Sequence, residues 1–251
     1  MSKQATLERR RAARLNAERA SAARDLRARR LWRLGAVAAA AAVVVVAVVI
    51  LSSPQEREAR APAAPSSLFA GLTERGGVLG DPDAPLTVTE YVDLQCPVCA
   101  QASAATLPPL IRDYVRTGKV KLAARTLHFL GPDSVRAARV AAGAERQGRL
   151  WPFLEAFYAR QGTENSGYAT DAFLREVAQA AGVDAGRALA AADSRFAAQR
   201  LERANADAAR VGVEGTPTLT VRRGDGPERP LDANPLDPAS VAAALDAEAR
   251  R

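Results

Sequence analysis

Apolar residues recur along this chain with two different spacings, and the changes between them predict an α/β domain. Alternating positions over residues 86–93 (LTVTEYVD) are typical of a strand, and residues 119–129 indicate a second strand. Residues 97–116, between them, have helical spacing, so the right-handed crossover rule makes the two strands parallel. Four helical stretches, two short strands and a last helix follow, at residues 134–147, 151–161, 170–181, 193–211, 218–222, 229–232 and 238–250.

The longest uninterrupted apolar run is residues 34–51, which contain only Leu, Gly, Ala, Val and Ile. As a helix this run would be about 27 Å long, which is enough to cover the core of a bilayer. The alternative is a buried Ala-Val helix of a soluble protein, but the β-branched run Val43–Val46 gains little helicity in water. We therefore expect a single N-terminal transmembrane helix before the α/β domain.

The positive charge of the chain lies almost entirely before this run. Residues 1–33 hold ten Arg and one Lys against three acidic residues, a net +8, so the remainder of a chain with net charge +7 sums to −1. A folded nucleic-acid-binding surface would need a basic patch of its own, so no nucleic-acid partner is expected. Arginines directly before the span place the N-terminus in the cytoplasm by the positive-inside rule. We expect a basic cytoplasmic tail at 1–33 and a single-pass protein of the cell membrane.

Residues 52–69 indicate an extracytoplasmic linker, rich in Pro, Ala and charged residues, before a domain at 70–251. A cleaved signal peptide is the alternative, because Ala59-Arg60-Ala61 resembles a cleavage site. The apolar run is longer than usual for such a peptide, the site lies well beyond its end, and Pro62 follows the cut. We favour a retained signal-anchor. In either case the domain faces an oxidising space in which disulfides persist.

Both cysteines of the chain lie in Cys96-Pro97-Val98-Cys99, where the strand at 86–93 gives way to a helix. The free N–H groups and the dipole at a helix N-terminus favour a thiolate at Cys96, and Pro97 suits the first helical turn. Cys99, one turn later, is expected to be the buried resolving thiol. Val98 offers no hydrogen bond to the thiolate. The motif predicts a reversible dithiol.

No metal site or cofactor is expected. A structural zinc ion needs four ligands, and the chain has two cysteines and one histidine, His128, which we interpret as structural. The aromatic residues Trp151, Phe153, Phe157 and Tyr158 have helical spacing and are interpreted as helix core rather than a peptide groove.

The chain resembles the DsbA-like thiol:disulfide oxidoreductases over roughly residues 77–251. The resemblance rests on the CxxC at the first strand-to-helix junction together with Gly80-Asp81-Pro82-Asp83-Ala84-Pro85, Glu90-Tyr91-Val92-Asp93 and Val213-Glu214-Gly215-Thr216-Pro217. It implies an α/β thioredoxin fold that carries an inserted helical subdomain at about 134–211. Val98 departs from DsbA itself, which has a histidine at that position, so we expect a less oxidising site.

The resemblance also implies roles for residues outside the motif. Glu90 would be a buried acid that relays a proton to or from Cys99, with Asp93 as the alternative. The Thr216–Pro217 bond would be cis and face the CxxC, where the backbone of Thr216 pairs with substrate.

The function implied is an enzyme that exchanges its disulfide with cysteines of exported polypeptides, as an oxidase. Its partner would be a membrane protein that reoxidises it, DsbB-like or vitamin K epoxide reductase-like. A reductant or disulfide isomerase, for example in cytochrome maturation, remains an alternative because the residues do not set the direction of electron flow. A noncatalytic binding module on the same scaffold is a third possibility, although such modules usually lack one or both cysteines.

Overall fold

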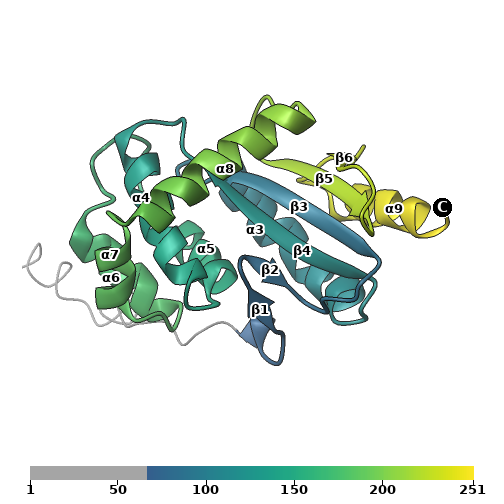
Figure 1. Cartoon of the computed structure of the whole chain (residues 1–251), viewed down its shortest axis with the longest axis horizontal. Coiled ribbons are helices and arrows are strands. Elements are labelled where there is room, and N and C mark those ends of the chain that lie inside the picture. Colours follow the sequence, from purple (N-terminus) through teal and green to yellow (C-terminus); the bar gives the residue numbers. More distant parts are fainter. Residues whose placement is uncertain (1–66) are drawn as a thin grey trace, which may run out of the picture. The chain divides into compact units, whose positions relative to one another are not determined.

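The computed structural model describes residues Ser67–Arg251, which build a six-stranded mixed sheet with helices around it (Figure 1). In the described sheet β3 and β4 are parallel, and the other neighbouring strands are antiparallel. The strands, in their spatial order, are β1 (Glu74–Arg75), β2 (Val78–Leu79), β4 (Val120–Leu127), β3 (Leu86–Asp93), β5 (Thr218–Arg223) and β6 (Arg229–Pro230). The predicted α/β class and the parallel βαβ unit are confirmed.

Helices lie in the β3–β4 and β4–β5 connections, and a last helix follows β6. Figure 1 shows α4 to α7 gathered at one end of the sheet and α9 at the other. A 3-10 turn (Ser67–Phe69) precedes β1, and a π-helical turn (Ile111–Val115) continues α3. The helices are α3 (Pro97–Leu110), α4 (Pro132–Glu145), α5 (Leu150–Tyr158), α6 (Asp171–Ala180), α7 (Ala185–Ala191), α8 (Arg195–Val211) and α9 (Pro238–Ala249).

The central strand β3 is buried on both faces because each face is covered by a different helix. Its alternation places residues 86, 88, 90 and 92 on one face and residues 87, 89, 91 and 93 on the other. Val88 and Val92 belong to the main core, which also contains Leu107 and Leu110 of α3. Tyr91 packs in a second cluster with residues of α8. Glu90 therefore shares a face with the core residues beneath α3.

The insertion between β4 and β5 contains five helices in the described chain, whereas the sequence predicted four. The extra helix, α7, has only seven residues (AGRALAA), too few and too alanine-rich to give a periodic signal. The β1–β2 hairpin was also not predicted, because its strands have two residues each. The interpretation of Trp151, Phe153 and Phe157 as helix core is confirmed, since all three are fully buried.

The expected cytoplasmic tail at 1–33, the transmembrane helix at 34–51 and linker residues 52–66 lie outside the described residues. Among the helices of Ser67–Arg251, none combines the length and the apolar character that a membrane crossing requires.

The contact between α4 and α7 depends on the missing side chain of Gly143. A Cβ atom at this position would lie 2.5 Å from the carbonyl oxygen and 2.7 Å from the Cα of Ala188, both of them backbone atoms. We expect Gly143→Ala to force the two helices apart and to lower the free energy of unfolding by about 1–3 kcal/mol. Chemical denaturation of the full chain measures this loss.

Gly186→Ala, on the facing helix α7, is the matched control. The nearest atom to its added Cβ is a side-chain oxygen at 3.4 Å, and alanine is the better helix former. Equal stability of the two variants would contradict the steric explanation.

Candidate active site

The two cysteines lie at the N-terminus of α3, directly after the turn that follows β3. Cys96 is the N-cap residue, with φ −70° and ψ 116°, and Pro97 occupies the first helical turn. The Cys96 Sγ accepts a hydrogen bond from the backbone N–H of Cys99 at 3.4 Å. Both cysteines are free thiols, and Cys96 keeps 6% of its surface exposed whereas Cys99 has none. Cys96 is therefore the sulfur that a second molecule can reach, while Pro97 and Val98 beside it are exposed.

Thr216 contacts Cys96 although it lies 120 residues later in the chain, directly before Pro217. The peptide bond between Thr216 and Pro217 is cis, as the resemblance implied. The Cys96 thiol donates a hydrogen bond to the carbonyl oxygen of Thr216 at 3.4 Å. The sheet explains this contact, because antiparallel pairing puts Thr218, at the start of β5, opposite Tyr91, near the end of β3. The structure thus brings the two sequence motifs to one site.

The surroundings of the two thiols shift their pKa values in opposite directions. A hydrogen bond from the Cys99 side chain lowers the pKa of Cys96 to about 6, and the backbone N–H groups of Cys99 and Val98 act in the same direction, against the effect of burial. Burial raises the pKa of Cys99 far above its ordinary value, and the neighbouring Cys96 adds to this. At neutral pH the pair therefore holds one thiolate, on Cys96, and one thiol, on Cys99. Such a division gives the two groups different chemical roles.

Glu90 lies in the core beneath α3, on the same face of β3 as Val88. It is partly buried, and loss of hydration raises the pKa of its carboxyl group to about 7. It lines a small cavity with Ala102, which stands one turn after Cys99, and with Thr106. Within Ser67–Arg251 no hydrogen bond joins Glu90 to either cysteine, so its role in proton transfer remains a prediction.

Asp93 has a different position and a different set of partners. Its side chain is fully buried on the opposite face of β3, and its two oxygens accept hydrogen bonds from the backbone N–H groups of Gln95, Phe129 and Leu130 and from the hydroxyl of Ser134. A carboxylate with four donors is well suited to fix the turn before Cys96. The geometry favours Glu90 over Asp93 as the candidate acid.

His128 directly follows β4, and burial lowers the pKa of its imidazole, which keeps the ring neutral at physiological pH. Its Nδ1 atom is buried and has no hydrogen-bond partner among the described residues. Within Ser67–Arg251, no three His, Cys, Asp or Glu side chains come together as metal ligands would.

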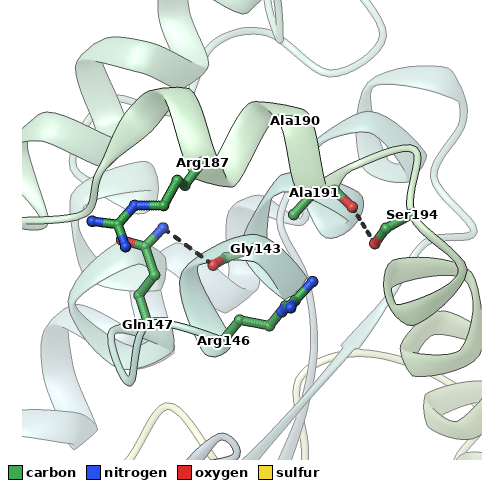
Figure 2. A pocket seen from close by; sticks show the side chains of 7 residues that line it. All are labelled: Gly143, Arg146, Gln147, Arg187, Ala190, Ala191 and Ser194. Atoms are coloured by element: carbon green, nitrogen blue, oxygen red, sulfur yellow. Dashed lines mark hydrogen bonds between the residues drawn. The ribbon is translucent and has the colours of Figure 1, made fainter.

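A separate pocket lies between α4 and α7 (Figure 2), lined by residues such as Gly143, Arg146 and Arg187. Gly143 is nine residues, or about 13 Å, along α4 from Ser134, which touches the turn before the CxxC. Both arginines are already engaged, since Arg187 pairs with Asp184 and Arg146 lies over the ring of Phe196. This pocket is therefore not part of the cysteine site.

A thioredoxin-type sheet with a CxxC at the N-terminus of its first long helix and a cis-proline opposite defines the class of protein. Residues 72–246 match the family model described as Thioredoxin, so the chain belongs to that family. The chain is 30% identical over 114 residues to the probable disulfide bond formation protein D of Bacillus cereus, an alignment that covers 45% of this chain and 52% of that protein. It spans about half the length of the curated relatives it matches.

Solved structures support the same fold. BdbD from Bacillus subtilis superposes with a TM-score of 0.62 at 22% identity, covering 75% of this chain and 97% of that one. DsbA2 from Pseudomonas aeruginosa superposes with a TM-score of 0.54 at 25% identity, covering 72% of this chain and 97% of that one. The predicted thioredoxin fold with a helical insertion, and the resemblance to DsbA-like proteins, are confirmed.

Several residues around the site were not found from the sequence. Gln95, Ser134, Gln161 and Asn165 hydrogen-bond to the turn before Cys96 or to one another. They belong to a turn, a helix and a loop that are far apart in the chain, and no short motif connects them.

The acidity of Cys96 can be measured directly. We expect the thiolate absorbance of the reduced full chain at 240 nm to titrate near pH 6, and iodoacetamide to label Cys96 but not Cys99. The pKa of the Cys96 thiol is about 6 in the folded chain, below its ordinary value of 9.0. The reduced form should therefore gain stability relative to the oxidised form as the pH rises from 6 to 9. This gain is lost as the pH falls back through 6.

Cys99→Ala is the informative variant, because it removes the side chain that contributes most to this acidity. The Cys96 titration should then move toward pH 9. A midpoint near pH 9 in the unmodified chain would contradict the assignment of Cys96 as the acidic thiol.

Proposed function

We propose that this protein is a thiol:disulfide oxidoreductase that exchanges a Cys96–Cys99 disulfide with cysteines of exported polypeptides, as an oxidase. The observation that carries the proposal is the Cys96 sulfur, which caps α3, faces the cis Thr216–Pro217 bond and has a pKa lowered to about 6. The names of its relatives, which include a probable disulfide bond formation protein, support the same reaction.

The proposed reaction begins when a substrate thiolate attacks the Cys96 sulfur of the disulfide. A bond forms between the substrate sulfur and Cys96, the Cys96–Cys99 bond breaks, and Cys99 leaves with the electron pair. Since burial strongly raises the pKa of Cys99, its thiolate takes up a proton, and Glu90 is the proposed donor. With a pKa of about 7, Glu90 is protonated often enough to give a proton and then recover it.

A second substrate thiolate completes the reaction by attacking the first substrate sulfur. The substrate disulfide forms and Cys96 leaves as a thiolate, so that two electrons have passed from the substrate to the enzyme. The helix N-terminus that stabilises this thiolate makes Cys96 a good leaving group. During the exchange the backbone of Thr216 would pair with the substrate chain beside the mixed disulfide.

Stabilisation of the reduced form is also the argument for the oxidase direction. A lowered pKa at Cys96 favours the thiolate over the disulfide, and this makes the pair a stronger oxidant. A reductant or isomerase is the second candidate, supported by Val98, which adds no hydrogen bond to the thiolate.

The proposed setting follows from the N-terminal sequence. Residues 34–51 would anchor the protein in the cell membrane, with residues 1–33 in the cytoplasm and the cysteine domain outside. Reoxidation then requires an electron acceptor in the membrane, for which a DsbB-like or vitamin K epoxide reductase-like protein is proposed.

Substitution of the nucleophile tests the reaction. We expect Cys96→Ser to reduce oxidation of a dithiol peptide by the full chain to the uncatalysed rate, because the variant cannot form the Cys96–Cys99 disulfide that the substrate attacks. Equilibration with glutathione should give wild type a potential above the thioredoxin value of about −270 mV. A lower potential would support the reductant instead, and activity that survives Cys96→Ser would exclude the proposed enzyme.

Glu90→Gln tests the proton relay. This change keeps the size of the side chain but removes its proton chemistry, so we expect peptide oxidation to slow by roughly 10²-fold and to lose the part of its pH dependence centred near pH 7. Stopped-flow rates from pH 5 to 9 measure both effects.

Glu202→Gln, at an exposed position on α8, is the control and should leave the profile unchanged. A Glu90→Gln profile identical to that of wild type would remove Glu90 from the mechanism.

A further inference from the structure

The end of α5 and the loop after it, residues 158–165, lie against the turn that presents Cys96. We call this segment the strap. Its residue Gln161 donates two hydrogen bonds from one side-chain nitrogen, to the carbonyl oxygen of Leu94 at 2.7 Å and to that of Cys96 at 3.2 Å. A side chain of the helical insertion is thus bonded to the backbone of the candidate nucleophile.

Other contacts join the strap to the same turn. Tyr158 donates its hydroxyl to the carbonyl oxygen of Asp93 at 3.3 Å. The backbone N–H of Asn165 donates to Oε1 of Gln95 at 2.7 Å, and Nε2 of Gln95 donates to Oδ1 of Asn165 at 3.2 Å. Together with Gln161, these bonds reach each position from Asp93 to Cys96.

We propose that Gln161 is a positioning residue for the nucleophile, and that its amide holds the turn in the conformation that keeps the Cys96 sulfur within reach of its stabilising partners. The inference rests on the proposed thiol chemistry of Cys96, and it assigns part of that chemistry to the helical insertion.

The partners of the two carbonyl groups explain why Gln161 matters. Gln161 is the hydrogen-bond partner that the structure shows for the carbonyl of Leu94. Without it, a carbonyl of a fully buried residue loses its donor, which is costly enough to make the turn rearrange. The Cys96 carbonyl would keep only the bond from the Ala100 N–H, at 3.3 Å.

Small movements of this turn affect the sulfur because its own hydrogen bonds are long. The Cys96 Sγ lies 3.4 Å from the N–H donor of Cys99 and 3.4 Å from the Thr216 oxygen. A displacement of a few tenths of an ångström weakens the bond from the Cys99 N–H, and the thiolate loses stabilisation. The polar N–H end of the Gln161 amide, directed at the Cys96 backbone, would be lost as well.

The remaining strap contacts allow the substituted protein to fold. Tyr158 and Asn165 keep their bonds to Asp93 and Gln95, and the core of the insertion, including Phe157, does not involve Gln161. The effect of a substitution is therefore expected at the thiol rather than in global stability.

Gln161→Leu, in the full chain, tests the proposal because it removes both donors at similar volume. We expect the pKa of Cys96 to rise from about 6 to about 7, which lowers the thiolate fraction at pH 6 about fivefold. Thiolate absorbance and the rate of iodoacetamide labelling measure this, and the glutathione equilibrium should shift toward the oxidised protein. The substitution leaves in place the other titratable groups near the thiols, which are Cys99, Glu90, Asp93 and Tyr158.

Two further variants make the result decisive. Gln161→Glu keeps the length of the side chain but places a negative charge beside Cys96, and should raise the pKa of the thiol at least as much. Gln179→Leu, at an exposed position on α6, should leave the thiol titration as in wild type.

The proposal would be overturned if Cys96 had the same pKa in Gln161→Leu, Gln161→Glu and wild type. This holds even if urea denaturation shows that the variants are less stable, because Gln161 would then be a purely structural residue. A wild-type chain whose Cys96 titrates near pH 9, or which exchanges no disulfides, would instead contradict the proposed function itself.

Discussion

The hydrogen bond from the Cys99 backbone N–H to the Cys96 sulfur is the interaction on which the candidate site depends. It places a polarisable sulfur over the unsatisfied N–H groups at the start of α3, where a negative charge is stabilised by the helix itself. A serine or aspartate is the common residue at such a cap, and it would serve only to stabilise the helix. With cysteine in that position, the interaction that starts the helix also contributes to the acidity of the thiol, beside the larger effect of the Cys99 side chain.

The sheet topology brings segments that are distant in the sequence to the N-terminus of α3. β3 ends beside the start of β5, so the CxxC and the cis-proline loop meet at one edge of the sheet. The parallel neighbour β4 ends at the same edge, and the backbone that follows it, at Phe129 and Leu130, donates to Asp93. The helical insertion adds Tyr158 and Gln161 from a third direction. The turn before Cys96 is thereby held by contacts from several strands and from the helical insertion.

Sequence patterns predicted the parts of this structure that rest on local rules. The strand at 86–93 has the observed limits of β3, because strict alternation and a following turn define both ends. Cys96, Pro97 and Cys99 could be placed on a helix N-terminus because the motif lies between a predicted strand and a predicted helix, while the cis bond at Pro217 and the helical insertion came from the family resemblance. The hydrogen bonds of Gln95 and Gln161 could not be predicted, since an isolated glutamine carries no periodic signal and the partners include the carbonyls of Leu130 and Leu94, which are 35 and 67 residues away. The short helix α7 was missed for the related reason that alanine suits many environments.

The distance along the chain between Cys96 and Thr216 has a consequence for the timing of folding. The cysteine motif is synthesised well before the segment that supplies the Thr216 carbonyl, and the strap is made between them. Until the segment that contains Thr216 has been added, Cys96 lacks this neighbour and its surroundings are incomplete. The full set of contacts around Cys96 therefore forms only when the domain is complete.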